Sequence, residues 1–175
     1  MTIALYPGTF DPVHYGHIDI ATRAAAMFER LVVSVYDRSL KNLLFSTEER
    51  VALTRQALEH LPNVVVTSYT GLTVAFARQQ GASVMVRGLR VTHDFELEYQ
   101  MALTNKSLAL EVETVLLVTS LHYAFVSSSI VKEVALAGGC TDKMVPDFVR
   151  AALKDKFRAL GEISNDKVKV VSLLD

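Results

Sequence analysis

The stretch "LYPGTFDPVHYGHIDIATRA", residues 5–24, places a Pro-Gly turn and two histidines between an apolar run and a helical pattern. In a parallel α/β sheet, ligands bind beyond the carboxyl ends of the strands, where the chain turns from strand into helix. The first N–H groups of a helix lack partners and, together with the helix dipole, favour an anion. His14 and His17 flank Gly16 at such a helix start. The stretch therefore predicts a strand, a turn and a helix, with a phosphate site at the turn.

Short β-branched runs alternate with longer segments of helical periodicity along the rest of the chain. This alternation predicts βαβ units around a parallel sheet. Several runs are apolar throughout, as expected of strands that are covered on both faces. We expect an α/β fold, a Rossmann-like, doubly wound, parallel five-stranded sheet with helices on both faces. The expected strands are residues 3–6, 31–36, 64–68, 84–87 and 114–119.

Local signals mark the helix ends. Ser46 and Glu49 form a capping-box pattern at the start of one helix, and Gly81 is suited to close another in the left-handed conformation. Pro146 stands at a first-turn position of the last helix. The expected helices are residues 17–30, 46–61, 72–81, 92–110, 128–139 and 146–160.

Composition limits the class of protein. The 175 residues are 50% hydrophobic and carry a net charge of -1, which predicts a packed core and no basic surface for a long polyanion. We expect one domain over residues 1–160 and a tail over 161–175 without an assigned role. The single Cys140, the absence of a basic leader and the shortness of the apolar runs suit a cytoplasmic protein. Neither nucleic acid nor a membrane is an expected partner.

Two further motifs follow predicted strands. "VMVRGLR" places Arg87 at a strand end and Arg90 in the loop beyond it, and "SSSIVK" places hydroxyls and free N–H groups at another helix start. Each has a plainer interpretation: the arginines as surface ion pairs, the serines as N-caps and the histidines as polar caps of the turn. Paired cations at the sheet edge that also holds the histidine turn favour phosphate recognition.

These blocks together resemble a known family. "YPGTFDPVHYGH" is similar to the first H-x-G-H signature of the nucleotidylyltransferase superfamily, and "FVSSSIVK", residues 125–132, to its second. "VRGLR", residues 86–90, followed by "DFELEYQMA", residues 94–102, is similar to the third. In this order and spacing, the blocks resemble the bacterial phosphopantetheine adenylyltransferase family over residues 4–153.

The resemblance implies transfer of the adenylyl group of ATP to 4′-phosphopantetheine, giving dephospho-coenzyme A and pyrophosphate in coenzyme A biosynthesis. Because the attacking phosphate oxygen is already ionised, catalysis should consist of positioning and electrostatic stabilisation. Mg²⁺ is the implied cofactor, held mainly by the triphosphate and water, so no protein metal site is expected. A homohexamer and coenzyme A as a possible feedback ligand are also implied.

The same resemblance implies roles residue by residue. His14 is expected to shape the turn. The expected catalytic residues are His17, Lys41, Thr9 and Arg90. The expected ATP-binding residues are Thr9, Phe10, His17, Gly88, Leu89, Arg90, Glu98, Tyr123, Ala124, Phe125, Val126, Ser127, Ser128 and Ser129. Thr9, Lys41, Thr73 and Arg87 are the residues expected to bind 4′-phosphopantetheine.

The chain departs from the family pattern at a few positions. Leu43 stands where a proline is usual, Thr73 where a larger apolar residue is common, and Leu97 where an aromatic residue is common. Three alternatives stay open at this point: a related nucleotidylyltransferase with another phosphate-bearing acceptor, a fragment of an aminoacyl-tRNA synthetase, and a non-catalytic nucleotide-binding module. The synthetase is disfavoured because the chain lacks a basic surface signal for tRNA.

Overall fold

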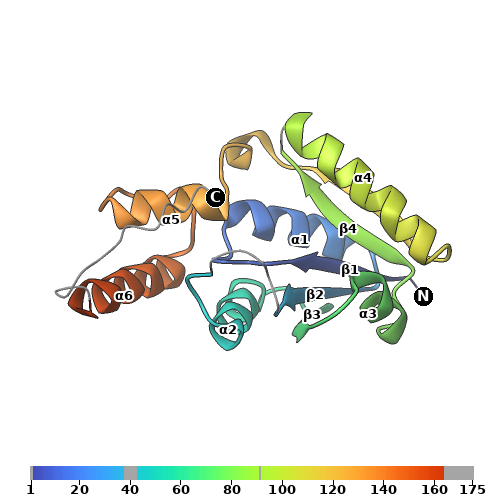
Figure 1. Ribbon diagram of the computed structural model, residues 1–175, viewed down its shortest axis with the longest axis horizontal. Helices are drawn as coiled ribbons and strands as arrows, with labels where there is room; N and C mark the ends of the chain where they lie inside the picture. Colours follow the sequence, from blue (N-terminus) through green and yellow to red (C-terminus); the bar gives the residue numbers. More distant parts are fainter. Residues whose placement is uncertain (1, 38–42, 91, 164–175) are drawn as a thin grey trace.

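The computed structural model describes residues 2–37, 43–90 and 92–163 (Figure 1). Within these residues, five parallel strands form one sheet. The predicted α/β class and the parallel five-stranded sheet are confirmed. The strands are β1 (Ile3–Gly8), β2 (Arg30–Tyr36), β3 (Val64–Tyr69), β4 (Val84–Leu89) and β5 (Glu113–Val118). Their order in the sheet is β3-β2-β1-β4-β5.

Strands β1 and β4 run two residues further than their patterns predict. Gly8 lies opposite Val35 of β2, and Gly88 lies opposite Leu117 of β5. Pro7, Gly8 and Gly88 are residues that usually interrupt a strand pattern. Here the neighbouring strands continue to pair with them, so both strands carry their glycines to the same edge of the sheet.

Helices cover both faces of the sheet, as predicted. Helices α1 (Tyr15–Met27) and α2 (Thr47–Ala57) share one core with the alternate strand residues Ala4 and Tyr6. Helix α3 (Thr73–Gln79) and the residues that follow helix α4 (Thr92–Leu108) share the other core with Leu5. Successive strand residues point to opposite faces, so the apolar runs supply both cores at once.

Two further helices lie beyond the carboxyl end of the sheet. Helices α5 (Ser128–Leu136) and α6 (Asp147–Ile163) pack side by side there (Figure 1). The short 3₁₀ helix η1 (Leu121–Tyr123) precedes them. Helix α6 continues past residue 160, and residues 164–175, most of the expected tail, lie outside the described residues.

The capping box and the glycine signal hold in the structure, whereas Pro146 lies directly before α6 and not inside its first turn. The Ser46 side chain accepts the Glu49 N–H at 3.3 Å, and the Glu49 carboxylate accepts the Ser46 N–H at 2.7 Å. Gly81 has a φ of 67°, the left-handed conformation expected after α3. In the part of the chain that the structure describes, no helix has the length and apolar character needed to cross a membrane.

The order of the strands locates the ligand crevice. From β1 the chain winds outward through β2 and β3, and it then returns to pair β4 against the other side of β1. The carboxyl ends of β1 and β4 therefore form the topological switch point of this sheet. The histidine turn follows β1 and the arginine motif ends β4, so the two predicted motifs meet there.

Candidate active site

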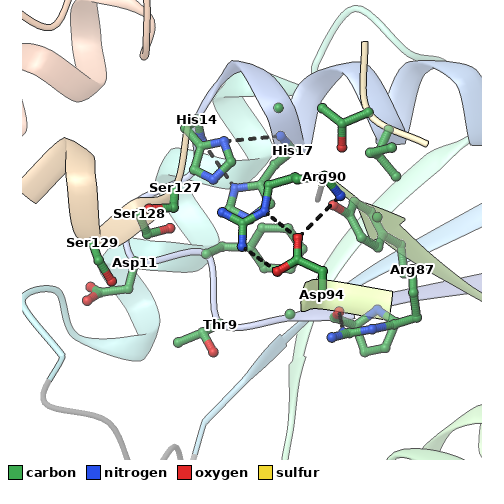
Figure 2. Close-up of a pocket in the computed structure, with 18 of the residues that line it drawn as sticks. Thr9, Asp11, His14, His17, Arg87, Arg90, Asp94, Ser127, Ser128 and Ser129 are labelled. Carbon is green, nitrogen blue, oxygen red and sulfur yellow. Dashed lines mark hydrogen bonds and ion pairs between the residues drawn. The ribbon is translucent and has the colours of Figure 1, made fainter. Parts of the chain in front are cut away.

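A cleft of about 360 Å³ opens at this switch point (Figure 2). It is lined by residues from the turn after β1, the end of β4, the first part of α4 and the start of α5. Ten of the predicted site residues line it: Thr9, Phe10, His17, Arg87, Gly88, Arg90, Glu98, Ser127, Ser128 and Ser129. Motifs more than a hundred residues apart in sequence thus surround one space.

His14 and His17 hold each other at the start of α1. The His14 Nδ1 accepts the His17 N–H at 3.3 Å, and the His17 Nδ1 accepts the His14 N–H at 3.3 Å. The two rings stack, with centroids 3.6 Å apart. Figure 2 shows both residues at the top of the cleft. Because each Nδ1 is an acceptor, each neutral ring carries its proton on Nε2. His14 is the N-cap of α1.

Both imidazoles are held neutral. Burial lowers the pKa of His14 from 6.5 to about 3, with the Arg90 charge adding to the effect. Burial also lowers the pKa of His17 well below 6.5, with smaller contributions from His14, Arg90 and Arg87. A neutral His17 can offer its Nε2–H to an anion in the cleft as a hydrogen-bond donor.

The turn itself has an unusual backbone. Phe10 has a φ of 51°, which a residue with a side chain rarely adopts, and its ring is buried. The ring packs edge-on against His17, with centroids 4.8 Å apart. A Cβ atom at Gly8 would lie 2.9 Å from the Phe10 ring, so only glycine leaves room for this arrangement.

The two arginines of the second motif are paired with carboxylates of α4. Arg87 donates to Glu98 through Nε at 2.8 Å and Nη2 at 2.7 Å, and its Nη1 donates to the Pro7 carbonyl at 2.8 Å. Arg90 donates to Asp94 through Nε at 2.9 Å and Nη2 at 3.1 Å (Figure 2). The plainer interpretation, an ion pair, describes both arginines, but the pairs lie in the cleft.

The three serines have separate roles. The Ser127 side chain accepts the Ile130 N–H at 3.2 Å and caps α5. The Ser128 hydroxyl donates to the Pro12 carbonyl at 3.0 Å, which ties α5 to the turn after β1. Ser129 is exposed and lines the cleft. The first turn of α5 therefore presents N–H groups to the same space as the first turn of α1.

A second cavity of about 320 Å³ adjoins the first on the side of α3. Thr9, Arg87 and Glu98 line both cavities, and Thr73 lines only the second. The Tyr69 hydroxyl is 2.9 Å from the Thr73 hydroxyl. The predicted acceptor residues that the structure describes thus gather around this second cavity.

Some predicted residues lie outside the lining of the cleft. Lys41 lies outside the described residues. Tyr123 stacks on Tyr15 at 5.8 Å, Phe125 is exposed, and the Val126 carbonyl accepts Arg90 Nη1 at 3.3 Å. The predicted ATP-binding residues that do not line the first cavity are Leu89, Tyr123, Ala124, Phe125 and Val126.

Four polar residues around the cleft, Asp11, Lys132, Arg50 and Asp94, were assigned no role from the sequence. Buried Lys132 pairs with buried Asp11 at 2.8 Å, and Asp11 also accepts the Phe45 N–H at 2.9 Å. Arg50, on α2, is fully buried behind the turn. Asp94 holds Arg90. Asp11 is an acid inside the otherwise apolar turn "TFDPV", a pattern that could have indicated a buried, paired carboxylate. Arg50 follows two glutamates in a polar helix, so nothing in the sequence indicates its burial.

The carboxylates of the first cavity leave no metal cage. Asp11 is bonded to Lys132, Asp94 to Arg90 and Glu98 to Arg87. Across residues 2–37, 43–90 and 92–163, no group of three histidine, cysteine or acidic side chains is placed to hold an ion. A magnesium ion here would have to take its oxygen ligands from a bound phosphate chain and water.

Comparison with known proteins decides the family. Residues 5–134 match the cytidylyltransferase-like family model. The chain is 54% identical to the phosphopantetheine adenylyltransferase of Desulforudis audaxviator over 93% of this chain and 99% of that protein. The chain belongs to the phosphopantetheine adenylyltransferase family. The relative from Carboxydothermus hydrogenoformans is 48% identical over 92% of this chain and 99% of its own.

Membership in the phosphopantetheine adenylyltransferase family confirms the predicted resemblance and makes the chain a nucleotidyltransferase by class. A solved chain from Vibrio parahaemolyticus, assigned as a nicotinate-nucleotide adenylyltransferase, aligns with a TM-score of 0.69 over 90% of this chain and 96% of its own. At 16% identity, that likeness supports the fold alone.

Proposed function

We propose that this protein transfers the adenylyl group of ATP to 4′-phosphopantetheine, giving dephospho-coenzyme A and pyrophosphate. The observation that carries the proposal is the cleft at the switch point, where His17, Arg90 and Ser128 converge from three elements. The cleft belongs to a chain that is 54% identical to a phosphopantetheine adenylyltransferase. Such a role would place the protein in coenzyme A biosynthesis in the cytoplasm.

The chemistry requires cations and donors rather than a base. A phosphate monoester is already ionised near neutral pH, so its oxygen can attack the α-phosphate of ATP without losing a proton. The barrier comes from bringing two anions together and from the charge on the five-coordinate α-phosphate. A neutral His17, with its proton on Nε2, suits this task because it donates without exchanging a proton.

The proposed role of each residue depends on which of the two cavities it lines. His17, Ser128 and Ser129 would bind the ATP phosphates, with Arg90 stabilising the transition state from the end of β4. Thr9 lines both cavities, so it would orient the acceptor phosphate, together with Lys41, for attack. Arg87 and Thr73 would hold the acceptor. The remaining nucleotide contacts would come from Phe10, Gly88, Leu89, Glu98, Tyr123, Ala124, Phe125, Val126 and Ser127.

We expect Mg²⁺ to accompany ATP and to neutralise part of the triphosphate charge when bound. The donor set supports ligation by substrate and water, because each carboxylate of the first cavity is bonded to a cation. The chain's own contribution would then be the placement of Arg90, His17 and the first turn of α5 around the phosphates.

Assembly into a homohexamer is part of the proposal. Phe95, Tyr99 and Leu103 recur every four residues on α4 and are 45%, 53% and 55% exposed. An exposed apolar stripe of this kind favours contact with another copy of the chain. Light scattering coupled to size-exclusion chromatography should give six times the 19.3 kDa of one chain, and Leu103→Lys should lower that mass.

One assay tests the function. Pyrophosphate release is measured with ATP and Mg²⁺ and, in parallel, 4′-phosphopantetheine, pantetheine, nicotinate mononucleotide or phosphocholine. Turnover with 4′-phosphopantetheine alone, lost in His17→Ala, is the expected result. Turnover with another acceptor would assign a related nucleotidylyltransferase, and ATP binding without any turnover would assign a nucleotide-binding module. Melting with added coenzyme A tests the feedback ligand, since a bound ligand raises the midpoint.

A further inference from the structure

Arg50 is a buried cation whose four acceptors are carbonyl and hydroxyl oxygens. Its Nη1 donates to the Thr9 carbonyl at 2.8 Å and to the Tyr36 carbonyl at 2.9 Å. Its Nε donates to the Phe45 carbonyl at 3.2 Å, and its Nη2 to the Thr47 hydroxyl at 2.8 Å. The side chain is 0% exposed, so it cannot itself touch a substrate in the cleft. A guanidinium in such a setting stays charged.

The guanidinium joins three parts of the fold. Thr9 follows β1, Tyr36 ends β2, and Phe45 and Thr47 lead into α2. The backbone of Phe45 is fixed on both sides of its Cα, since its N–H donates to Asp11 at 2.9 Å and its carbonyl accepts the Arg50 Nε–H. A planar fork with several donors is needed to reach acceptors in these separate directions.

One of these bonds acts on the cleft. The only cis peptide among the described residues is Asp11–Pro12, so the Thr9–Phe10 peptide is trans and its N–H points opposite to its carbonyl. With the carbonyl turned toward Arg50, the Phe10 N–H points away from it. None of the hydrogen bonds found among residues 2–37, 43–90 and 92–163 uses that N–H as donor. Both Thr9 and Phe10 line the cleft.

This peptide is also held in an unfavourable conformation. The φ of 51° at Phe10 persists only where surrounding contacts determine it. The ring contacts Gly8 and His17 on the cleft side, and Arg50 holds the Thr9 carbonyl on the other. The positive charge behind the carbonyl also polarises the peptide and strengthens its N–H as a donor.

We propose that Arg50 is a positioning residue, which orients the Thr9–Phe10 peptide so that the Phe10 N–H and the Thr9 hydroxyl meet the phosphates in the cleft. It acts through the backbone and not through substrate contact. The proposal rests on the adenylyl-transfer function proposed above.

The test is Arg50→Lys, which keeps the charge but offers three donors from one atom in place of a fork. We expect kcat at saturating substrates to fall about tenfold or more, since small misplacements of reacting groups have effects of this size. Arg55→Lys is the matched control on the same helix, because Arg55 donates to the Val66 carbonyl away from the cleft. It should keep kcat within about twofold.

Urea unfolding of each variant separates positioning from stability. If Arg50→Lys unfolds at a lower urea concentration than wild type but keeps the wild-type kcat per folded chain, the proposal is overturned. If that variant does not fold, Thr47→Val removes one acceptor of Arg50 and should still lower kcat; an unchanged kcat then overturns it. If wild-type protein turns over no acceptor, the proposed function fails separately. The ATP-induced rise in melting temperature then decides: a smaller rise in Arg50→Lys supports the positioning role, and an equal rise overturns it.

Discussion

The two sides of the cleft hold their cations in different ways. On the fixed side, formed by His14, His17, Asp11, Lys132 and Arg50, polar groups bond to backbone or are buried with their partner. On the adjustable side, formed by Arg87, Arg90, Asp94 and Glu98, each arginine makes a two-point bond to a carboxylate that lines the cleft.

This difference means that one side keeps its polar groups in fixed positions, whereas the arginines of the other side can exchange their partners. On the fixed side, the histidines and Arg50 are held through backbone groups, and Lys132 is held by buried Asp11, so this side keeps the same arrangement before and after a ligand enters. A carboxylate presents two oxygens to a guanidinium much as a phosphate does. The partly exposed arginines of the adjustable side can therefore trade carboxylate for phosphate, while the buried cations of the fixed side cannot.

The largest expected effect is on the fixed side. His17→Ala removes the Nε2–H donor from the cleft, together with the Nδ1 acceptor of the His14 N–H at the start of α1. We expect kcat to fall by about 10²–10³, the usual loss for one transition-state donor. Steady-state pyrophosphate release measures kcat, and urea unfolding checks that the helix start survives. A kcat within tenfold of wild type would place His17 outside the chemistry.

The second-largest expected effect is on the free energy of unfolding. Lys132→Met leaves the Asp11 carboxylate buried without its cation, and loss of one partner of such a pair costs about 3 kcal/mol of unfolding free energy. Urea denaturation measures the loss. Asp11→Asn combined with Lys132→Met removes the stranded charge and should recover part of it. Equal stability of the single and double variants would mean that water reaches Asp11 and that this side is not fixed.

Acid should weaken the fixed side through its histidines. The folded protein keeps the pKa of His14 near 3 and that of His17 well below 6.5, whereas in the unfolded chain both bind protons below about 6.5. Their contribution to stability is therefore complete above pH 6.5 and is lost as pH falls toward the folded values, by up to about 1.4 kcal/mol per histidine and pH unit. Urea midpoints from pH 7 to 5 measure this slope. His14→Asn, which keeps an N-cap, should show about half of it; an unchanged slope would refute the neutral pair.

The smallest expected effect is on the adjustable side, and its sign is opposite. Asp94→Asn frees Arg90 from a competing carboxylate, so ATP should bind about two- to fivefold more tightly, as suits a partly exposed pair. Titration calorimetry measures the affinity. Asp142→Asn, which breaks the Arg150 pair on α6, is the control with the same change of charge. Weaker ATP binding in Asp94→Asn alone would show that Asp94 positions Arg90 instead of competing for it.

The fold could be predicted from the sequence because the signals that specify its strands and helices are local. Apolar strand runs and the capping box of Ser46 and Glu49 depend on neighbours in the chain, and the structure confirms them. Most of the predicted site residues line one cleft, because motifs that follow parallel strands meet at one edge of the sheet.

What the sequence could not supply were the partners of those residues. Nothing near Arg50 in the sequence indicates that two of its acceptors are the Thr9 carbonyl, just after β1, and the Tyr36 carbonyl at the end of β2, up to 41 residues away. The Lys132–Asp11 pair spans 121 positions. Likewise, the bonds from Arg87 and Arg90 to Glu98 and Asp94 depend on how α4 docks on β4, which the helical pattern leaves open. The candidate donors can therefore be predicted from the sequence, whereas the groups that hold them depend on tertiary packing.

The two cavities meet at a shared wall, and the residues that line both are Pro7, Gly8, Thr9, Arg87 and Glu98. A single molecule that extends across this wall would give up its translational and rotational freedom once, whereas two separate ligands give it up twice. Its two halves would raise each other's effective concentration without any new contact. For inhibitor design, the wall is thus a point at which two weak fragments can be joined into one strong ligand.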